Sequence, residues 1–325
     1  MSYSYRAAVI GLGKIGSSYP SNEVPRTHTE VYLKNKKINF VAGVDTDDSA
    51  RKDFSHRWGR EVPVFSTVKD MLSKIQPDIV SICVPTSKLI YVIKEFSKKP
   101  PKLFFLEKPV INNFDNSKSI LDAINKVPTA VNYHRCWDPS HTRFFEKILK
   151  SGTVISVRVI YNKGMFNYAS HIITLLSCYF GRVLNIRNME VQTHNIKNLD
   201  PSFSFILDFN YGVQAVFQGF DEIQYDLLEL EMITTSGVYS IKSAGCRKRQ
   251  ELPKKSVFYP NYTQLIDAPY HEQDRQVEGL VQAVNNIINF LDGKDQRLFC
   301  NLETSLEASK IMCKIKKINK PTLSK

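Results

Sequence analysis

Ala7-Ala8-Val9-Ile10-Gly11-Leu12-Gly13-Lys14-Ile15-Gly16 runs from a strand-like apolar segment directly into the pattern G-x-G-x-x-G. Each glycine has a physical role in a dinucleotide site. Gly11 allows a tight turn after the strand, Gly13 lets the backbone approach a pyrophosphate, and Gly16 lets the following helix pack closely on the strand. The N-terminus of that helix would offer backbone N–H groups to the diphosphate. The stretch predicts a nicotinamide-dinucleotide fold.

A second apolar strand, expected at 38–44, ends at Asp45. A carboxylate at the tip of the second strand can accept hydrogen bonds from the adenosine ribose hydroxyls, and its charge repels a 2′-phosphate. Asp47 and Asp48 add negative charge, and we expect no nearby arginine to reverse it. The cofactor expected is therefore NAD(H) rather than NADP(H).

Length and composition describe an ordinary globular chain. With 325 residues, 42% hydrophobic and 23% charged, the chain can form two domains with a sizeable core. Its longest apolar run is far shorter than a membrane span, so no membrane association is expected. The first strand begins a few residues after Met1, so we expect no leader and a cytoplasmic protein.

The net charge is +12, from 44 Lys and Arg against 32 Asp and Glu. A basic balance favours either nucleic acid or a polyanionic small substrate such as a nucleotide-sugar. The lysines are dispersed and no nucleic-acid motif accompanies them, so a solvated basic surface with no nucleic-acid partner is expected. The six cysteines lack C-x-x-C pairs, which indicates reduced thiols and no metal site or disulfide framework.

Strands and helices alternate over the first 130 residues, which predicts a doubly wound parallel sheet. The expected strands after the glycine motif are 38–44, 62–65, 78–84, 103–106 and 129–133. The expected helices are 27–36, which starts with a capping box from Thr27 to Glu30, then 66–74, 88–98 and 117–126.

The second part of the chain predicts an α+β domain with a large, mostly antiparallel sheet that carries helices on one face. Its expected strands are 154–161, 188–192, 203–209, 213–220, 227–234 and 238–242. Its expected helices are 140–150, 167–179, 277–291 and 302–317, and 247–268 is expected to be polar and irregular. The expected domains are 1–128 and 129–325, with room for the last helices to pack on the first domain.

Two segments could carry catalysis. Glu107-Lys108-Pro109 follows a buried strand at the sheet edge where ligands bind, so Lys108 could donate to a substrate hydroxyl and move a proton; the alternative is a surface lysine in a loop. His171 shares a predicted helix face with Asn167, four residues earlier; the alternative is a core histidine bonded to a backbone carbonyl.

A third segment, 132–139, follows the last strand of the first domain. Tyr133, His134 and Arg135 could face a cleft there, and Arg135 could hold a phosphate or carboxylate. A structural hinge is an equally good explanation. The remaining histidines lie among polar residues and are expected at the surface: His28, His56, His141, His194 and His271.

These motifs together resemble the glucose–fructose oxidoreductase / inositol dehydrogenase / rhizopine catabolism family of NAD(P)-dependent oxidoreductases, over nearly the whole length. The resemblance depends on the glycine motif, Gly43-Val44-Asp45, Val84-Pro85-Thr86, Glu107-Lys108-Pro109, Asn132-Tyr133-His134-Arg135 and Gly164 through His171. It implies an N-terminal Rossmann domain, a C-terminal domain with a large sheet, and a nicotinamide between Lys108 and His171. The lysine would bind the reacting hydroxyl and the histidine would act as acid/base.

The site expected from the motifs and the resemblance has three parts. The catalytic residues are Lys108, His171 and Asn167. The cofactor-binding residues are Gly11, Gly13, Lys14, Ile15, Gly16, Asp45, Pro85, Thr86, Glu107 and Lys108. The candidate substrate contacts are Tyr133, His134, Arg135 and Lys163.

The chain departs from the family pattern at three positions. Asn167 and Thr174 stand where the family often has aspartates beside the histidine, and Leu89 stands where it has a histidine. The loss of those carboxylates removes groups that in the family would raise the pKa of this histidine and fix its tautomer. Family members tied to bacterial surface-sugar synthesis are similar in the Asn-x-x-Ser-His segment, so the change is interpreted as a subgroup trait.

The function expected is hydride transfer between NAD(H) and a secondary alcohol or ketone of a sugar or nucleotide-sugar, possibly in surface-polysaccharide synthesis. Two alternatives on the same scaffold remain: a cofactor-binding regulator without turnover, and an NAD-assisted glycosidase. Apolar alternation over 203–209 and 213–220 also predicts a homo-oligomer, most simply a dimer, through the C-terminal sheet.

Overall fold

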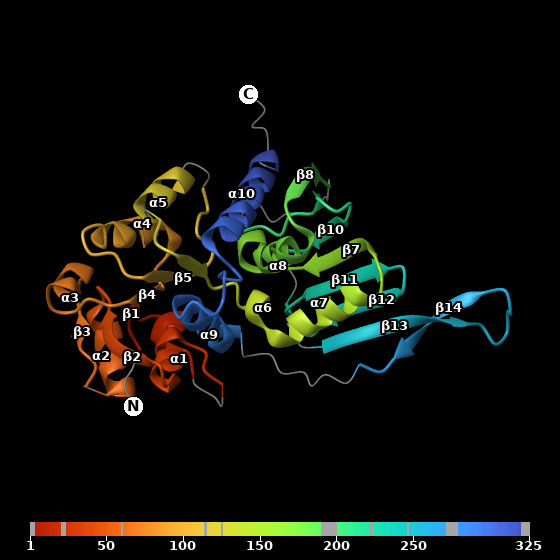
Figure 1. The fold of residues 1–325 in the computed structure, drawn as a ribbon. Coiled ribbons are helices and arrows are strands. Elements are labelled where there is room, and N and C mark those ends of the chain that lie inside the picture. The colour runs from red at the N-terminus through yellow and green to blue at the C-terminus, as the bar shows by residue number, and fades with distance from the viewer. Residues whose placement is uncertain are drawn as a thin grey trace, which may run out of the picture. The chain divides into compact units, whose positions relative to one another are not determined.

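The computed structural model describes residues 4–20, 24–59, 61–113, 116–124, 126–189, 200–221, 224–245, 247–270 and 279–319. The chain forms two compact units (Figure 1). Unit 1 comprises Met1–Trp137 and Val277–Leu306, and unit 2 comprises Asp138–Gln276 and Glu307–Lys325.

Unit 1 contains a six-stranded parallel sheet in the order β3-β2-β1-β4-β5-β6. Its strands are β1 (Tyr5–Ile10), β2 (Ile38–Val44), β3 (Val64–Phe65), β4 (Ile79–Ile82), β5 (Leu103–Leu106) and β6 (Thr129–Val131). The chain builds outward to β3 and then returns to β4, so the strand order reverses between β1 and β4. In open α/β sheets, ligands bind at the carboxyl ends of the strands at such a switch point.

Helices lie on both faces of this sheet (Figure 1). They are α1 (His28–Lys34), α2 (Asp48–Trp58), α3 (Val68–Lys74), α4 (Thr86–Glu95), α5 (Asn116–Ile124), α6 (His134–Trp137) and α9 (Gly279–Leu291). Because both faces are covered, every residue of β4 and β5 is buried, which explains their continuous apolar sequence. The predicted doubly wound sheet is confirmed.

Local signals explain where several helices begin. The Thr27 hydroxyl accepts a hydrogen bond from the Glu30 backbone N–H, and the Glu30 carboxylate accepts one from the Arg26 N–H. The side chains of Asp47 and Thr67 cap α2 and α3 by accepting hydrogen bonds from the backbone N–H groups of Ser49 and Asp70. Helix α2 is absent from the sequence-based expectation because its residues are mostly charged and show little apolar periodicity.

Unit 2 contains an eight-stranded sheet in the order β14-β13-β12-β11-β7-β10-β9-β8. Its strands are β7 (Val154–Tyr161), β8 (Val183–Asn188), β9 (Phe205–Phe209), β10 (Gln214–Gly219), β11 (Leu228–Thr234), β12 (Gly237–Lys242), β13 (Arg247–Lys255) and β14 (Thr263–Ala268). Among the strand pairings of the described residues in this sheet, only β7–β10 is parallel. The predicted mostly antiparallel sheet is confirmed. The strand expected at 188–192 lies largely outside the described residues.

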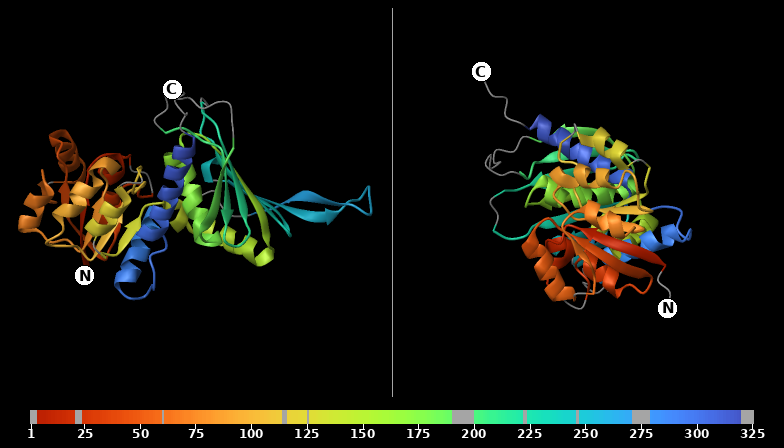
Figure 2. Two further views of the ribbon diagram at one scale, coloured as in Figure 1. Left: turned by 90° about the horizontal axis from the view of Figure 1, so that it is seen from above. Right: turned by 90° about the vertical axis from the view of Figure 1, so that its left-hand side faces the viewer.

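Helices α7 (Pro139–Ser151) and α8 (Ser170–Phe180) lie over one face of this sheet (Figure 2). The side chains that point to that face are buried, among them Phe205, Leu207 and Phe217 at 0% exposure. The apolar alternation that suggested an uncovered dimer face is therefore the core of this unit. The final helix, α10 (Leu302–Ile318), continues from unit 1 into unit 2.

The expectation that 247–268 is irregular is wrong. Strands β13 and β14 form an antiparallel hairpin there, paired from Gln250↔Ala268 to Lys255↔Thr263. Both faces of its outer part meet solvent, so the sequence lacks the apolar alternation that marks a half-buried strand, and backbone hydrogen bonds define the structure instead. No helix in the described part of the chain combines the length and apolarity needed to cross a bilayer.

Candidate active site

The glycine motif forms a tight cradle at the carboxyl end of β1. Gly11 has φ +93°, and a Cβ there would lie 2.6 Å from the Cys83 carbonyl oxygen. A Cβ on Gly16 would lie 1.9 Å from the Gly11 carbonyl oxygen, so both positions require glycine. A Cβ on Gly13 would meet nothing within 4 Å. The backbone at Gly13 therefore borders open space, as a diphosphate-binding turn requires.

The helix expected directly after the motif is only a single π-helical turn, η1 (Lys14–Ser18). Pro20 and Pro25 follow, and the next helix, α1, begins at His28. The sequence therefore supplies no long helix dipole here. The groups available to bind a diphosphate are the backbone N–H groups of the turn itself, which include those of Lys14 and Ile15.

Asp45 lies at the tip of β2, and its carboxylate is fixed by two backbone N–H groups. Leu12 N donates to Oδ2 at 2.7 Å, and Asp47 N donates to Oδ1 at 2.9 Å. Each carboxylate oxygen has a second lone pair, so both can still accept hydrogen bonds from ribose hydroxyls. The bond from Leu12 also links the acidic tip of β2 directly to the glycine turn.

The expectation that no arginine lies near Asp45 is wrong. Arg51 Nη1 donates to the carbonyl oxygens of Asp45 at 2.8 Å and Thr46 at 3.0 Å, and Nη2 pairs with Asp48 at 2.9 Å. Arg51 lies in the first turn of α2. Because this helix starts directly after the tip of β2, the Arg51 side chain can reach back to the carbonyl groups of that tip. Its charge is already shared with Asp48 and two carbonyl groups.

A cavity of about 450 Å³ opens at the switch point between β1 and β4. Gly11, Gly13, Asp45 and Pro85 line it, together with Thr67 at the start of α3. Its volume lies within the usual range for small-molecule sites. The open Gly13 backbone, the acidic β2 tip and this cavity together fit the adenosine and diphosphate parts of an NAD cofactor.

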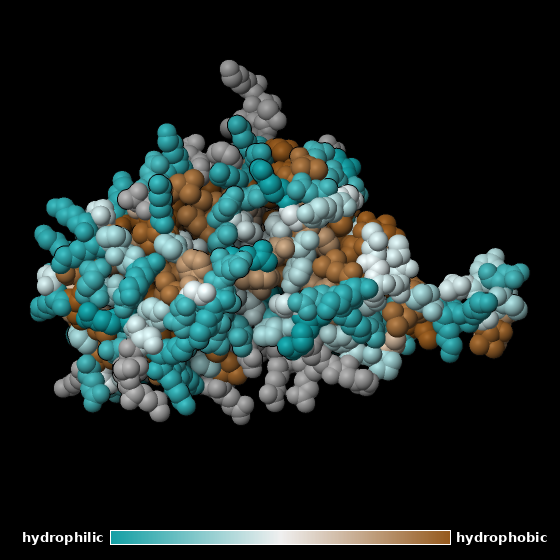
Figure 3. All heavy atoms as spheres, viewed as in Figure 1, coloured by the Kyte–Doolittle hydropathy of each residue, from teal (hydrophilic) through white to brown (hydrophobic). Residues whose placement is uncertain are grey.

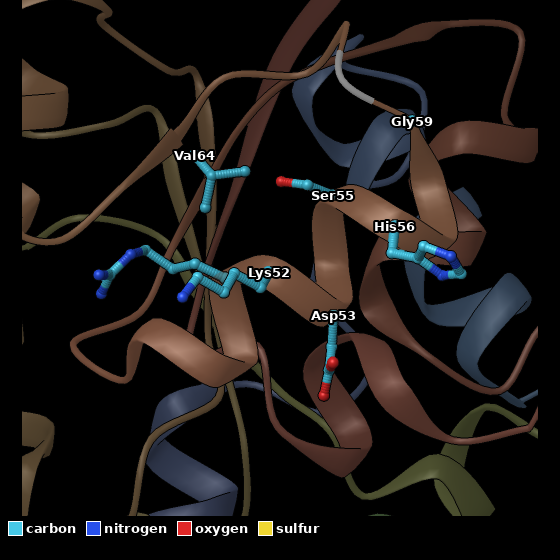
Figure 4. A pocket seen from close by; sticks show the side chains of 7 residues that line it. Lys52, Asp53, Ser55, His56, Gly59 and Val64 are labelled. Carbon is cyan, nitrogen blue, oxygen red and sulfur yellow. The ribbon is translucent and has the colours of Figure 1, made fainter.

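A second hollow, of about 750 Å³, lies beside α2 and is lined by Arg51, Lys52, Asp53, Ser55, His56, Gly59 and Val64. Figure 4 shows Lys52, Asp53 and His56 pointing in different directions rather than toward one point. A ligand site needs convergent polar groups, so this hollow is a surface groove rather than a second active-site candidate.

Glu107, at the end of β5, belongs to a buried polar network that the sequence did not indicate. Its Oε1 accepts a hydrogen bond from Asn132 Nδ2 at 2.6 Å and lies 3.0 Å from His28 Nε2. His28 Nδ1 lies 2.7 Å from Ser81 Oγ, which lies 2.7 Å from the Tyr32 hydroxyl. The network therefore links α1, β4 and β5 directly behind the Glu-Lys-Pro turn.

The hydrogen bonds of the network can run in one direction, from Tyr32 through Ser81 and His28 to Glu107. Burial raises the pKa of Tyr32 well above its usual value, so the phenol keeps its proton and can donate a hydrogen bond to Ser81. Ser81 can then donate to Nδ1 of His28, whose Nε2–H donates to Glu107. Burial, followed by the nearby charge of Glu107, also raises the pKa of the Cys83 thiol.

His28 is fully buried, and His141 is 2% exposed, so the expectation that both lie at the surface is wrong. Polar residues next to a histidine in the sequence do not predict that the histidine is exposed. Here those neighbours are themselves buried, because they cap helices or belong to hydrogen-bond networks. His56 is exposed as expected, whereas His194 and His271 lie outside the described residues.

Lys108 is half-buried and follows Glu107 directly, and the Lys108–Pro109 peptide bond is cis. Thr86 Oγ1 donates to the Pro109 carbonyl oxygen at 2.9 Å, which attaches this turn to the start of α4. Pro85 is the N-cap of α4 and lines the cavity. Pro85, Thr86, Glu107 and Lys108 therefore all lie at one edge of the unit 1 sheet.

The candidate substrate contacts of unit 1 are more buried than expected of cleft residues. Tyr133 is 0% exposed and Arg135 is 7% exposed, and Arg135 Nη1 lies 3.3 Å from His134 Nε2. Asn132 Oδ1 is buried and has no hydrogen-bond partner among the described residues, although its Nδ2 is bound to Glu107.

In unit 2, the helix expected at 167–179 is divided into a π-helical turn, η2 (Met165–Ala169), and α8, which begins at Ser170. Asn167 is exposed, whereas His171 is buried at 3% exposure. The π turn shifts the helical phase, so positions four apart differ in exposure here. Asp200 holds the start of η2, because its carboxylate accepts hydrogen bonds from Phe166 N and Asn167 N, both at 2.9 Å.

Lys163 is exposed and forms an ion pair with Asp226. Asp226 also accepts a hydrogen bond from the Tyr168 hydroxyl at 3.1 Å. Asp200 and Asp226 thus organise the segment that contains His171, and sequence analysis missed both. They lie far from the motif in sequence, and no local pattern marks them.

The acidic β2 tip, the glycine cradle and the switch-point cavity define unit 1 as a dinucleotide-binding domain. Residues 5–133 match the model of the Gfo/Idh/MocA family, an oxidoreductase family with an NAD-binding Rossmann fold. This part of the chain belongs to that family of NAD(P)-dependent oxidoreductases. The recognition made from the motifs is confirmed. A search of curated proteins found no match.

Solved structures share the fold over nearly the whole chain. The WlbA dehydrogenase from Bordetella pertussis, in complex with NADH and UDP-GlcNAcA, is 15% identical with a TM-score of 0.73, and covers 96% of this chain and 95% of its own. A super-repressor mutant of Gal80p from Saccharomyces cerevisiae is 16% identical with a TM-score of 0.75, at 97% and 96% coverage. An Agrobacterium radiobacter oxidoreductase with NAD+, L-tartaric acid and magnesium is 13% identical with a TM-score of 0.70, at 95% and 94% coverage.

Proposed function

We propose that the protein transfers a hydride between NAD(H) and a secondary alcohol or ketone of a sugar or nucleotide-sugar, as a cytoplasmic step in surface-polysaccharide synthesis. One observation carries the proposal. The glycine cradle with Asp45 and the Glu-Lys-Pro turn lie at the carboxyl ends of β1, β2 and β5, along one edge of one sheet. The bound UDP-GlcNAcA of the WlbA dehydrogenase supports a nucleotide-sugar as substrate.

Bound NAD(H) supplies the hydride acceptor or donor. The chain's own residues bind the substrate and orient its reacting oxygen. The Lys108 ammonium donates a hydrogen bond to the reacting oxygen, while Glu107, held by His28 and Asn132, fixes the turn from which Lys108 extends. His171 is proposed to exchange the hydroxyl proton, and Asn167, four residues earlier, is proposed to orient its ring. Tyr133, His134, Arg135 and Lys163 are the proposed substrate contacts.

A screen of free and nucleotide-activated sugars, followed by NADH absorbance at 340 nm, tests the proposal. The expected result is stoichiometric, continuing cofactor consumption with at least one sugar. Substrate cleavage without net cofactor consumption would instead identify an NAD-assisted glycosidase. Cofactor binding without any turnover would favour a regulator, the alternative supported by the fold shared with Gal80p.

The proposed preference for NAD(H) has a direct test, because Asp45 and Arg51 have opposite effects on a 2′-phosphate. Wild-type protein should bind NADH more tightly than NADPH. Asp45→Ser should weaken NADH binding by about tenfold, as expected for losing a charge-assisted hydrogen bond, and should strengthen NADPH binding because the repelling carboxylate is gone while the positive charge of Arg51 remains nearby.

Fluorescence titrations with both cofactors measure this preference. The matched control is the double variant Asp45→Ser/Arg51→Ala, which should lose the gain in NADPH affinity. Tighter binding of NADPH than NADH by the wild-type protein would contradict the proposed preference.

A further inference from the structure

A cluster of polar side chains is buried beside the carboxyl ends of β5 and β6. Hydrophilic residues cover much of the surface visible in Figure 3, where bulk water can satisfy their hydrogen bonds. In the cluster, by contrast, His28 and Ser81 are 0% exposed and Asn132 is 5% exposed. Burying a polar group costs free energy unless it is hydrogen-bonded, so each donor and acceptor in this cluster should have a partner.

The side-chain amide of Asn132 is fixed in one orientation. Its Nδ2 lies 2.6 Å from Glu107 Oε1, and an ionised carboxylate accepts hydrogen bonds but donates none. The nitrogen of the amide therefore faces Glu107, and the oxygen faces away from it. Glu107 is itself held in place, because His28 Nε2 lies 3.0 Å from the same Oε1 atom. The buried network thus determines where the Asn132 oxygen lies.

This oxygen, Asn132 Oδ1, is an acceptor without a donor. It is buried and has no hydrogen-bond partner in the part of the chain that the structure describes. An unsatisfied buried acceptor destabilises a protein, because the atom has lost its hydrogen bonds to water and gained none in exchange. A ligand that places an N–H or O–H group against Oδ1 removes that cost. The amide orientation therefore favours a ligand with a hydrogen-bond donor.

Asn132 lies on the side of the switch point where the second half of a dinucleotide belongs. The glycine cradle on β1 and Asp45 on β2 fit the diphosphate and adenosine parts, and the sheet continues in the order β1-β4-β5-β6. Strand β5 is two strand spacings, about 10 Å, from β1, which the ribose and pyridine ring beyond a diphosphate can span. Asn132 follows β6 and bonds Glu107 at the end of β5.

We propose that Asn132 binds the carboxamide of the nicotinamide ring, with Oδ1 accepting a hydrogen bond from the carboxamide NH₂ group. Glu107 and His28 are positioning residues that hold this acceptor in place. A primary amide supplies the donor that Oδ1 lacks, and a hydrogen bond to it fixes the rotation of the pyridine ring about its bond to the ribose. The inference rests on the NAD(H) part of the proposed function and does not depend on the sugar.

Calorimetric titration of the full chain with three ligands tests the proposal. They are NAD+, its acetylpyridine analogue, in which a methyl group replaces the carboxamide NH₂, and ADP-ribose, which lacks the pyridine ring. Wild-type protein should bind NAD+ about tenfold more tightly than the analogue, the effect of one hydrogen bond to a buried acceptor. Asn132→Ala should bind NAD+ and the analogue equally, and its affinity for ADP-ribose should equal that of the wild type.

Two further variants complete this test. Asn132→Leu, which keeps the volume of the side chain, should behave as Asn132→Ala does. Asn39→Ala, which changes an exposed asparagine on β2, is the matched control and should keep the wild-type preference for NAD+. Equal wild-type affinities for NAD+ and the analogue would overturn the proposal, and so would a preference that survives in both Asn132 variants.

Two substitutions of His28 test the positioning role. The amide nitrogen of a glutamine can take the place of His28 Nε2 and donate to Glu107, whereas the shorter asparagine reaches only the side of Ser81. His28→Gln should therefore keep the preference for NAD+ over the analogue, and His28→Asn should reduce it. Equal behaviour of the two variants would overturn the positioning role.

The outcome for this inference is separate from the outcome for the proposed reaction, because the titrations need no sugar. A preference for NAD+ that Asn132→Ala removes would uphold the carboxamide contact even if no sugar is turned over. Sugar turnover by a wild-type protein that binds NAD+ and the analogue equally would overturn the contact and leave the proposed reaction in place.

Discussion

Lys108→Ala should reduce kcat with the substrate identified by the screen by roughly 10²- to 10⁴-fold, the usual effect of removing a proton-transfer group. Its ammonium is proposed to bind the reacting hydroxyl, which no neighbouring side chain of the turn replaces. The dissociation constant for NADH should remain nearly unchanged, because the glycine cradle and Asp45 lie on β1 and β2. Stopped-flow or steady-state kinetics together with NADH titration measure both quantities.

His171→Ala should have an effect of similar size for the same reason. Two matched controls isolate the chemistry. Lys102→Ala changes a lysine at the opposite end of β5, and His56→Ala changes an exposed histidine on α2; both should leave kcat unchanged. Near-normal turnover in His171→Ala would reject its role as acid/base and direct attention to His134 or Tyr133.

Gly16→Ala should destabilise the protein by roughly 3 kcal/mol or more and abolish measurable cofactor binding, because overpacking against rigid backbone cannot be relieved by a rotamer change. The new Cβ would lie 1.9 Å from the Gly11 carbonyl oxygen, so the turn must open. Thermal unfolding and NADH titration measure the two effects.

Gly13→Ala is the control that separates folding from binding. Its Cβ would meet no protein atom within 4 Å, so the melting temperature should stay close to that of the wild type. The methyl group would nevertheless stand where the diphosphate approaches the backbone, so NADH binding should still weaken. Unchanged NADH affinity in Gly13→Ala would mean that the cofactor does not cross this turn.

Much of unit 1 could be predicted because its signals are local. Strands β2 and β5 were placed at their observed bounds, since apolar runs flanked by polar residues are what a sheet covered on both faces requires. The glycine spacing and Asp45 likewise follow from backbone geometry within one βαβ unit. The family recognition depended on these same residues.

Features that depend on helix packing or on irregular helical geometry could not be predicted. Arg51 reaches the β2 tip only because α2 folds back along it, and His28 meets Glu107 only because α1 packs on β4 and β5. The π turn before α8 gives Asn167 and His171 different exposures, which helical periodicity alone does not anticipate. Each feature depends on how a helix packs against the sheet or on a departure from ideal helical geometry.

By itself the sequence determined the class of fold, the dinucleotide-binding cradle and the position of the Glu-Lys-Pro turn, because local steric and hydrogen-bonding requirements define all three. Only the tertiary structure decided which polar groups support that turn and which surface of unit 2 stays uncovered. The buried network around His28 and the hairpin of β13 and β14 arise from strand pairing and helix packing. The physical reason is that the burial of a side chain and the register of a strand are set when the strands and helices pack together. A single stretch of sequence does not determine either.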